Sequence, residues 1–235
     1  MALRLFLLRH GETEASISGQ YVGSGSDISL TAGGIKMAEQ FALAYKEHDW
    51  KGVYCSPLLR TRQTLAPLQA EMTSPVFFRD GLREINYGEW ELKSQEEIKA
   101  VNPEAMKNFH ENGDVFSPPG GETAIEVLNR AMSVLEEVRK EHVDGDILFV
   151  SHRTTLRVLL CSLLGVEIKR YRKCFEYLVC SVSMLELQNE GALLVLHGDR
   201  SHLENSLEIA SKIKAELKGR ELGNTVEEIR TERSR

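Results

Sequence analysis

The chain has 235 residues, of which 42% are hydrophobic, and this is enough for one sizeable globular domain. Its formal net charge of −6 argues against non-specific nucleic-acid binding, which requires a basic face. The same charge is compatible with a small anionic substrate, because a site can be locally positive within an acidic protein.

The N-terminal part predicts a strand, a loop and a helix. Residues 3–8 are an apolar run interrupted only by Arg4, which is typical of a largely buried parallel strand. A loop rich in glycine and serine follows over residues 11–29. Thr31 is then a good N-cap for a helix whose apolar positions recur as far as Tyr45.

The next elements are a strand, a helix and a second strand. Residues 53–55 predict a short strand. Ser56 followed by Pro57 predicts an N-cap and the first position of a helix, because proline suits that position. We expect this helix to end or kink near Pro67, and residues 76–78 to form another strand.

The stretch from about residue 85 to residue 121 is more polar and ends in a Pro- and Gly-rich run, so we interpret it as a partly helical excursion over one face of the sheet, a candidate lid. The regular pattern then predicts a helix at 122–142, a strand at 147–150, a helix at 154–164, and a hairpin with strands at 184–187 and 193–196.

Strands that alternate with helices indicate an α/β fold, which we expect to be a three-layer α/β/α sandwich with a mostly parallel central sheet. We assign residues 1–203 to this domain. Residues 204–235 are highly charged with a weak apolar stripe, and we expect them to form a helical C-terminal extension.

Two of the apolar strands end in a histidine. Residues 3–8 lead into Arg9 and His10, and residues 147–150 lead into Ser151 and His152. In open α/β sheets the ligand crevice lies just beyond the carboxyl ends of the strands, so adjacent strands would place both histidines in one crevice. A single histidine there is as often a plain polar residue, but two at matching strand ends favour a functional site.

Arg60 lies in the first turn of the helix that follows the strand at 53–55. It is either a solvated helical arginine or part of the same crevice, where a helix N-terminus also favours anions. Together with Arg9 and the two histidines it would form a compact positive pocket. The ligand that best fits such a pocket is a phosphoryl group, which arginine binds through paired hydrogen bonds.

Four motifs in chain order resemble the histidine phosphatase superfamily, which includes phosphoglycerate mutases. They are Arg9-His10-Gly11-Glu12-Thr13, Ser56-Pro57-Leu58 with Arg60, Leu82-Arg83-Glu84 with Gly88-Glu89-Trp90, and Val150-Ser151-His152. The resemblance runs from Leu3 to about Leu203 and implies a phosphoglycerate mutase-like fold.

The resemblance also implies a role for each matching residue. His10 would attack phosphorus and carry a phosphohistidine, and for this it must be neutral. Arg9, Arg60 and His152 would hold the phosphoryl oxygens during the transfer. No metal or other cofactor is implied, because the arginines supply the positive charge.

Glu84 would protonate the leaving oxygen and then help to activate water, with a salt bridge to Arg83 as the alternative role. Ser16 stands where the family usually has a phosphate-binding asparagine, and we expect Ser16 and Gly23 to contact substrate. Arg153 replaces a usual glycine. Its side chain would reach either a second acidic group of the substrate or a nearby carboxylate of the protein.

The leading hypothesis is therefore a phosphoric monoester hydrolase of the histidine acid phosphatase type, acting on a small phosphorylated metabolite. The short excursion resembles the phosphatase branches of the family. The alternatives are a cofactor-dependent phosphoglycerate mutase and, as a different class, a catalytically silent binding module.

Cys55, Cys161 and Cys180 lie in apolar runs, and none of the four cysteines has the spacing of a zinc or redox motif. No stretch approaches the length of a membrane span, and the N-terminus lacks a signal peptide's cleavage region. We expect a cytoplasmic enzyme with a small phosphate ester as its ligand and no nucleic-acid or membrane partner. The oligomeric state is open, and a homodimer is one option.

Overall fold

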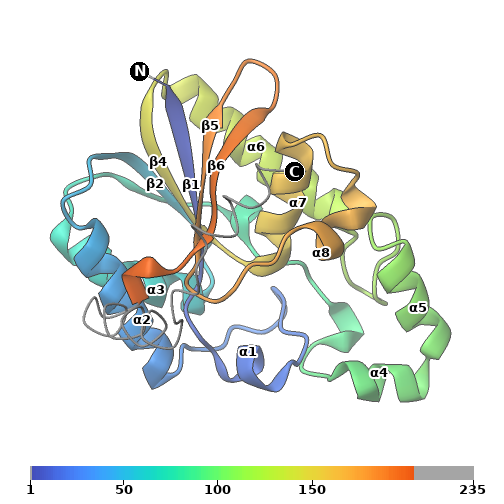
Figure 1. The fold of residues 1–235 in the computed structure, drawn as a ribbon. Helices are drawn as coiled ribbons and strands as arrows, with labels where there is room; N and C mark the ends of the chain where they lie inside the picture. Colours follow the sequence, from blue (N-terminus) through green and yellow to red (C-terminus); the bar gives the residue numbers. More distant parts are fainter. Residues whose placement is uncertain (1, 204–235) are drawn as a thin grey trace, which may run out of the picture. The chain divides into compact units, whose positions relative to one another are not determined.

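A computed structural model describes residues 2–203 (Figure 1). One compact unit ends at Arg200, and the 3₁₀ helix η4 (Ser201–Leu203) lies outside it. The predicted extension at 204–235 lies outside the described residues. The strands are β1 (Leu3–Arg9), β2 (Trp50–Cys55), β3 (Val76–Phe78), β4 (Gly145–Ser151), β5 (Val182–Leu187) and β6 (Ala192–Asp199).

The α-helices are α1 (Glu14–Ser18), α2 (Ala32–Tyr45), α3 (Leu59–Glu71), α4 (Gln95–Val101), α5 (Pro103–Glu111), α6 (Ala124–Glu141), α7 (Arg153–Leu163) and α8 (Tyr171–Cys174). Three further 3₁₀ helices are η1 (Asp80–Leu82), η2 (Gly88–Trp90) and η3 (Ile168–Arg170). Within residues 2–203, no helix combines the length and the apolar character needed to cross a membrane.

The six strands form one sheet in the order β3-β2-β4-β1-β5-β6. The first four are mutually parallel, while β5 and β6 form an antiparallel hairpin beside β1. The predicted α/β fold with a mostly parallel sheet is confirmed, as is the predicted hairpin. The register between β1 and β4 runs from Leu3 opposite Gly145 to Arg9 opposite Ser151, so both strands end at the same level.

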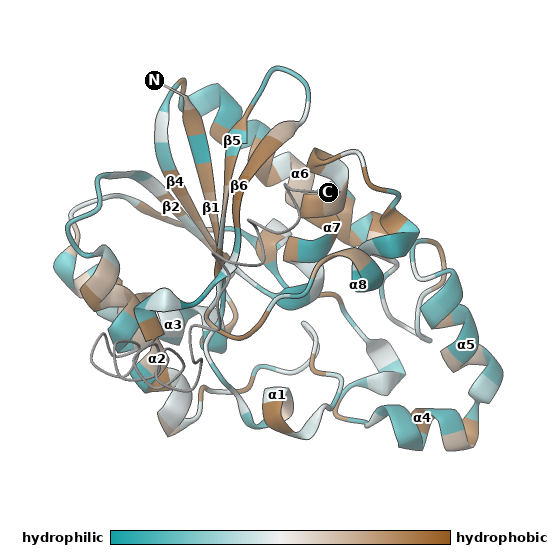
Figure 2. Cartoon of the chain, in the orientation of Figure 1, coloured by the Kyte–Doolittle hydropathy of each residue, from teal (hydrophilic) through white to brown (hydrophobic). Residues whose placement is uncertain are grey.

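Helices cover both faces of the sheet. Helices α2 and α3 pack together on one side, and α6 and α7 pack together on the other (Figure 1). Leu3, Leu5 and Leu7 of β1 point to the second side, where they join buried residues of α6 and α7 in one apolar cluster. Figure 2 colours the residues by hydropathy and shows hydrophobic residues along β1, β6 and α7 and mainly hydrophilic residues on α4.

The excursion does not cover a face of the sheet as predicted. It contains η2, α4 and α5, and its buried residues Trp90 and Phe109 pack against Val127 of α6 and Val158 of α7. The rings of Trp90 and Phe109 meet edge to face with centroids 5.1 Å apart. The apolar surface that these helices need to bury is therefore supplied by α6 and α7, and the excursion forms a flank beside the sheet.

Three further details differ from the predicted elements. Helix α3 begins at Leu59 after an uncapped Leu58, not at Ser56, and it continues through Pro67 to Glu71. The predicted loop at 11–29 contains the short helix α1, which begins with a capping box between Thr13 and Ser16.

Candidate active site

The register of the sheet brings His10 and His152 together. Each follows the last residue of its strand, and the His10 amide donates to the Ser151 carbonyl at 3.0 Å. The two imidazole rings have centroids 5.2 Å apart. Both side chains are buried, and this burial, followed by the charges beside them, lowers the pKa of each.

The hydrogen bonds of His10 define which ring nitrogen is free. Its Nδ1 lies 2.7 Å from the carbonyl oxygen of Gly11. A carbonyl can only accept, so Nδ1 carries the proton and Nε2 keeps its lone pair in the neutral ring. Burial and the charges of Arg9 and Arg60 hold the pKa of His10 well below its usual range. His10 is therefore a neutral imidazole with an available nucleophilic nitrogen.

His152 is held in the other tautomer. Its Nδ1 accepts from Nε of Arg60 at 3.2 Å, because a guanidinium can only donate. Its Nε2 therefore carries the proton and donates to the hydroxyl of Ser56 at 2.8 Å. Burial, Arg60 and His10 keep the pKa of His152 well below its usual range as well.

Arg60 is the second residue of α3 and is almost completely buried. Its Nη1 donates to the Ser26 carbonyl at 3.1 Å and its Nη2 to the Gly23 carbonyl at 3.0 Å. Gly23 is required there, since a Cβ atom would lie 1.9 Å from the carbonyl oxygen of Ile85. The predicted substrate-binding residue Gly23 thus forms part of the wall that fixes Arg60.

Arg9 is only partly engaged by the protein. Its Nη1 donates to the Tyr177 carbonyl at 2.5 Å, whereas its Nε is buried and has no hydrogen-bond partner. Burial, reinforced by the charge of Arg153, lowers the pKa of Arg9 to about 10. A buried guanidinium with an unused donor is costly unless an anion completes it, which suits a phosphoryl group.

Glu84 lies at the N-terminus of α7, beside His152. Its Oε1 accepts from the amides of Ile85 at 2.9 Å and Thr155 at 3.2 Å, and its Oε2 accepts from the amide of Thr154 at 3.0 Å. Free amides at the start of a helix favour a carboxylate in this position. Glu84 makes no salt bridge to Arg83, which pairs with Asp80 at 2.8 Å.

The remaining predicted site residues are engaged with the protein. The Ser16 hydroxyl donates to the Thr13 carbonyl at 2.7 Å within the capping box of α1. Arg153 donates from Nη2 to the Glu176 carboxylate at 2.8 Å, which is the second of the two directions considered for it. Substrate contacts by Ser16, Gly23 and Arg153 stay predictions.

Sequence reasoning missed several residues that shape the site. Ser56 was assigned to a helix cap, although its place directly after β2 matches that of the histidines after β1 and β4. Arg130 of α6 donates to the Glu84 carbonyl at 3.0 Å and to the Arg83 carbonyl at 2.6 Å. Nothing in the local sequence of Arg130 indicates this contact, which fixes the backbone that carries Glu84.

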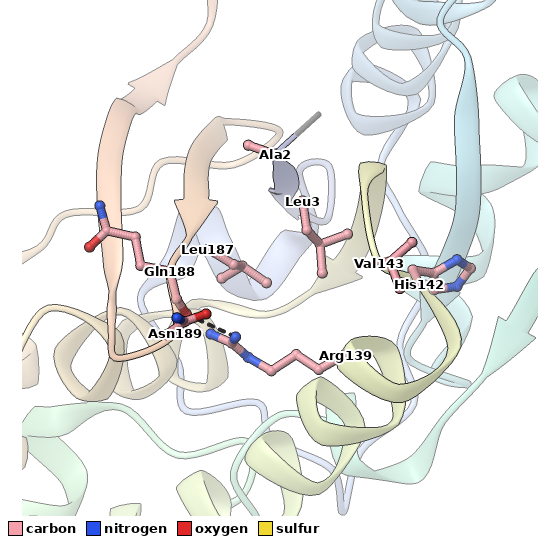
Figure 3. Close-up of a pocket in the computed structure, with 8 residues that line it drawn as sticks. All are labelled: Ala2, Leu3, Arg139, His142, Val143, Leu187, Gln188 and Asn189. Atoms are coloured by element: carbon pink, nitrogen blue, oxygen red, sulfur yellow. Dashed lines mark hydrogen bonds between the residues drawn. The ribbon is translucent and has the colours of Figure 1, made fainter.

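A surface pocket lies at the opposite end of the strands (Figure 3). It is lined by residues from the start of β1, the end of α6 and the β5–β6 turn. The Arg139 guanidinium binds the β5–β6 turn by donating to the Gln188 carbonyl at 2.9 Å. His142 Nε2 lies 3.1 Å from the Tyr54 hydroxyl. The chemically distinctive groups are therefore at the carboxyl ends of the strands.

Comparison with known proteins places the chain among phosphate-handling enzymes. The family model of the histidine phosphatase superfamily (branch 1) matches residues 5–200. Phosphoserine phosphatase 1 of Hydrogenobacter thermophilus is 32% identical over 169 residues, covering 72% of this chain and 80% of that protein. The probable phosphoglycerate mutase GpmB of Proteus mirabilis is 31% identical over 209 residues, covering 86% and 95%. The solved structure of Bacillus stearothermophilus YhfR superposes with a TM-score of 0.80 at 26% identity, covering 86% of this chain and all of that one.

Proposed function

The chain belongs to the histidine phosphatase superfamily (branch 1), and we propose that it hydrolyses a small phosphate monoester through a phosphohistidine on His10. The observation that carries this proposal is the state of His10. It is a neutral imidazole with Nδ1 bonded to a carbonyl, and it lies beside Arg9 and Arg60. This arrangement leaves Nε2 free to attack phosphorus.

In the first step, the Nε2 lone pair forms a bond to phosphorus while the ester P–O bond breaks. Glu84, in the enzyme form in which it carries a proton, gives this proton to the leaving oxygen, so the alcohol departs neutral. The phosphorylated ring gains positive charge, which the hydrogen bond from Nδ1 to the Gly11 carbonyl stabilises. Arg9 and Arg60 oppose the charge on the phosphoryl oxygens throughout.

In the second step, water attacks phosphorus and the P–N bond breaks, which returns His10 to its neutral form. The Glu84 carboxylate accepts the proton of the attacking water, and the enzyme is regenerated. The position of Glu84 supports both roles, since its carboxylate lies at the start of α7 directly after His152.

The relatives reported above include a phosphoserine phosphatase and a probable phosphoglycerate mutase, so hydrolysis and transfer must be separated by experiment. We expect 3-phosphoglycerate or another ester to give inorganic phosphate at the same rate with and without a bisphosphate primer. Conversion of 3-phosphoglycerate to its 2-isomer only when 2,3-bisphosphoglycerate is added would establish the mutase instead. Failure to release phosphate from any ester, including p-nitrophenyl phosphate, would leave the binding module.

Activity should survive prolonged chelation. The positive charge at the proposed phosphate site comes from Arg9 and Arg60, and within residues 2–203 no three side chains of His, Cys, Asp or Glu form a metal-binding group. After dialysis against EDTA, p-nitrophenyl phosphate hydrolysis is expected to stay within about twofold of the untreated rate. A loss that magnesium or zinc restores would show that the reaction depends on a metal.

A further inference from the structure

Two arginines of α7, one turn apart, share a single carboxylate. Arg153 donates from Nη2 to both oxygens of Glu176, at 2.8 and 3.1 Å. Arg157 donates from its Nη2 to Oε2 of the same carboxylate at 2.7 Å. The spacing of four residues places both arginines on one side of the helix. Arg153 and Arg157 together form a carboxylate receptor, in which both guanidinium groups donate to one carboxylate group.

This receptor adjoins the phosphate site. Arg153 is the first residue of α7, between His152 and Thr154, whose amide donates to Glu84. Glu176 directly precedes Tyr177, whose carbonyl accepts from Arg9. Arg153 and Arg157 are both close enough for their charges to lower the pKa of Arg9. A group bound between these two arginines would thus lie beside a phosphate held by Arg9.

The protein supplies Arg153 and Arg157 with too few anionic hydrogen-bond acceptors. The cluster has two guanidinium groups and one carboxylate. Arg157 is only 5% exposed, and its Nε is buried without a hydrogen-bond partner. Its pKa is lowered, first by burial and then by the charge of Arg153. Burying a cation is costly unless hydrogen-bonded anions complete it, so this cation is suited to a ligand that the protein does not itself supply.

Glu176 is the most exposed member of the cluster. Its side chain is 57% exposed, and it lies in the irregular segment between α8 and β5. Figure 1 shows this segment running from α8 towards the lower end of β5. The ion pair of Glu176 with Arg153 is exposed on both sides and is worth little. Its contact with the buried Arg157 is different, because another anion must replace it when Glu176 leaves. The fixed element is Arg157, and the exchangeable one is the carboxylate.

We propose that Arg153 and Arg157 form a subsite for a carboxylate on the leaving group of the substrate, and that Glu176 occupies this subsite until substrate displaces it. The inference rests on the proposed function for the identity of the neighbouring phosphate site. It restricts the substrate class to phosphate monoesters of hydroxy acids or amino acids. A carboxylate is the expected ligand because the occupant of the subsite is itself a carboxylate held by both arginines.

The test compares two esters that differ only in the carboxylate, O-phosphoserine and phosphoethanolamine. Both carry the same phosphate and ammonium group, so the ratio of their kcat/KM values reports on the carboxylate alone. In Arg153→Gln and Arg157→Gln this ratio should fall roughly 10- to 100-fold, the scale of a hydrogen bond to a charged group. In Glu176→Gln, which removes the competing charge, the ratio should rise by roughly 3- to 10-fold. Arg139→Gln, in the pocket at the other end of the strands, is the matched control and should leave the ratio unchanged.

A purely structural ion pair would give a different pattern. Loss of Arg153 or Glu176 would then lower thermal stability and reduce turnover of both esters equally, and an unchanged ratio in all three site variants would overturn the subsite. Binding of the same two esters to His10→Ala, measured by calorimetry, keeps this test separate from the chemistry. Tighter binding of O-phosphoserine that disappears in His10→Ala/Arg153→Gln supports the subsite even if the enzyme proves not to be a phosphatase. Equal binding of both esters to His10→Ala would overturn the subsite while phosphate release by the wild type still upholds the proposed function.

Discussion

His10→Ala is expected to hydrolyse p-nitrophenyl phosphate roughly four to six orders of magnitude more slowly than the wild type, because it lacks the nucleophile. The loss should be in kcat, because the substitution leaves the proposed phosphate contacts of Arg9 and Arg60 in place. Steady-state release of nitrophenol, measured with enzyme concentrations high enough to detect slow turnover, provides the comparison.

The matched control is His110→Ala on α5, where the imidazole lies outside the site and contacts Gln95 at 3.2 Å. This variant should retain the wild-type rate. The His10 side chain is buried, so its removal could disturb the fold. Near-ultraviolet circular dichroism, which reports on the packing of aromatic side chains, checks that His10→Ala is folded. If a folded His10→Ala retained more than a hundredth of the wild-type kcat, another group would have to be the nucleophile.

Glu84→Gln should separate esters by their leaving groups. Esters with poor, alkoxide-like leaving groups need the proton from Glu84 and should slow by roughly two to four orders of magnitude. Esters of acidic phenols leave without help and should slow far less. A plot of log kcat/KM against leaving-group pKa across aryl and alkyl phosphates should therefore be shallow for the wild type and steep for Glu84→Gln.

The structure indicates what must be controlled in this experiment. Glu84 accepts three backbone hydrogen bonds through its two carboxylate oxygens. In glutamine an NH₂ group takes the place of one of these oxygens, and it cannot accept a hydrogen bond from a backbone amide. Breaking such a bond costs about 1–3 kcal/mol of stability, so thermal unfolding is measured alongside the kinetics. A disturbance of the fold alone would shift all esters equally. Parallel plots for wild type and variant would show that Glu84 is not the acid.

The position of the two histidines follows from the sequence because it depends on two strands that are almost entirely apolar, with Arg4 as the one charged residue in 3–8 and 147–150. Residues 3–8 and 147–150 carry no competing local signal, and β1 and β4 match them to within two residues at each end. Parallel neighbours end at the same edge of a sheet, so the residues that follow them must meet. The strand pattern was therefore enough to predict that His10 and His152 share a crevice once the strands are adjacent.

Ser56 shows why local signals failed elsewhere. Its sequence context is that of a good N-cap, yet its hydroxyl bonds to Nε2 of His152, and the chain stays extended at Leu58 before α3 begins. A contact with a residue 96 positions away decides the structure here, and no propensity includes it.

The place of Glu84 could not be derived from its own surroundings either. Its carboxylate is held by amides at the start of α7, 70 and 71 residues further along the chain. Only the resemblance of its motif to the histidine phosphatase superfamily indicated this residue. By contrast, the spacing of Arg153 and Arg157 was visible in the sequence, but its meaning depended on Glu176, which lies in an irregular segment without a periodic pattern.

During turnover, phosphate is expected to pass through a covalent bond to His10. Mixing the enzyme with 2,4-dinitrophenyl phosphate, whose leaving group departs easily, and quenching in alkali within milliseconds should trap phosphate on the protein. Peptide mapping should place it on His10, and it should be stable in base and lost in acid. Phosphate on any other residue, or steady release of dinitrophenol without an initial burst and without protein-bound phosphate, would show that His10 is not the nucleophile.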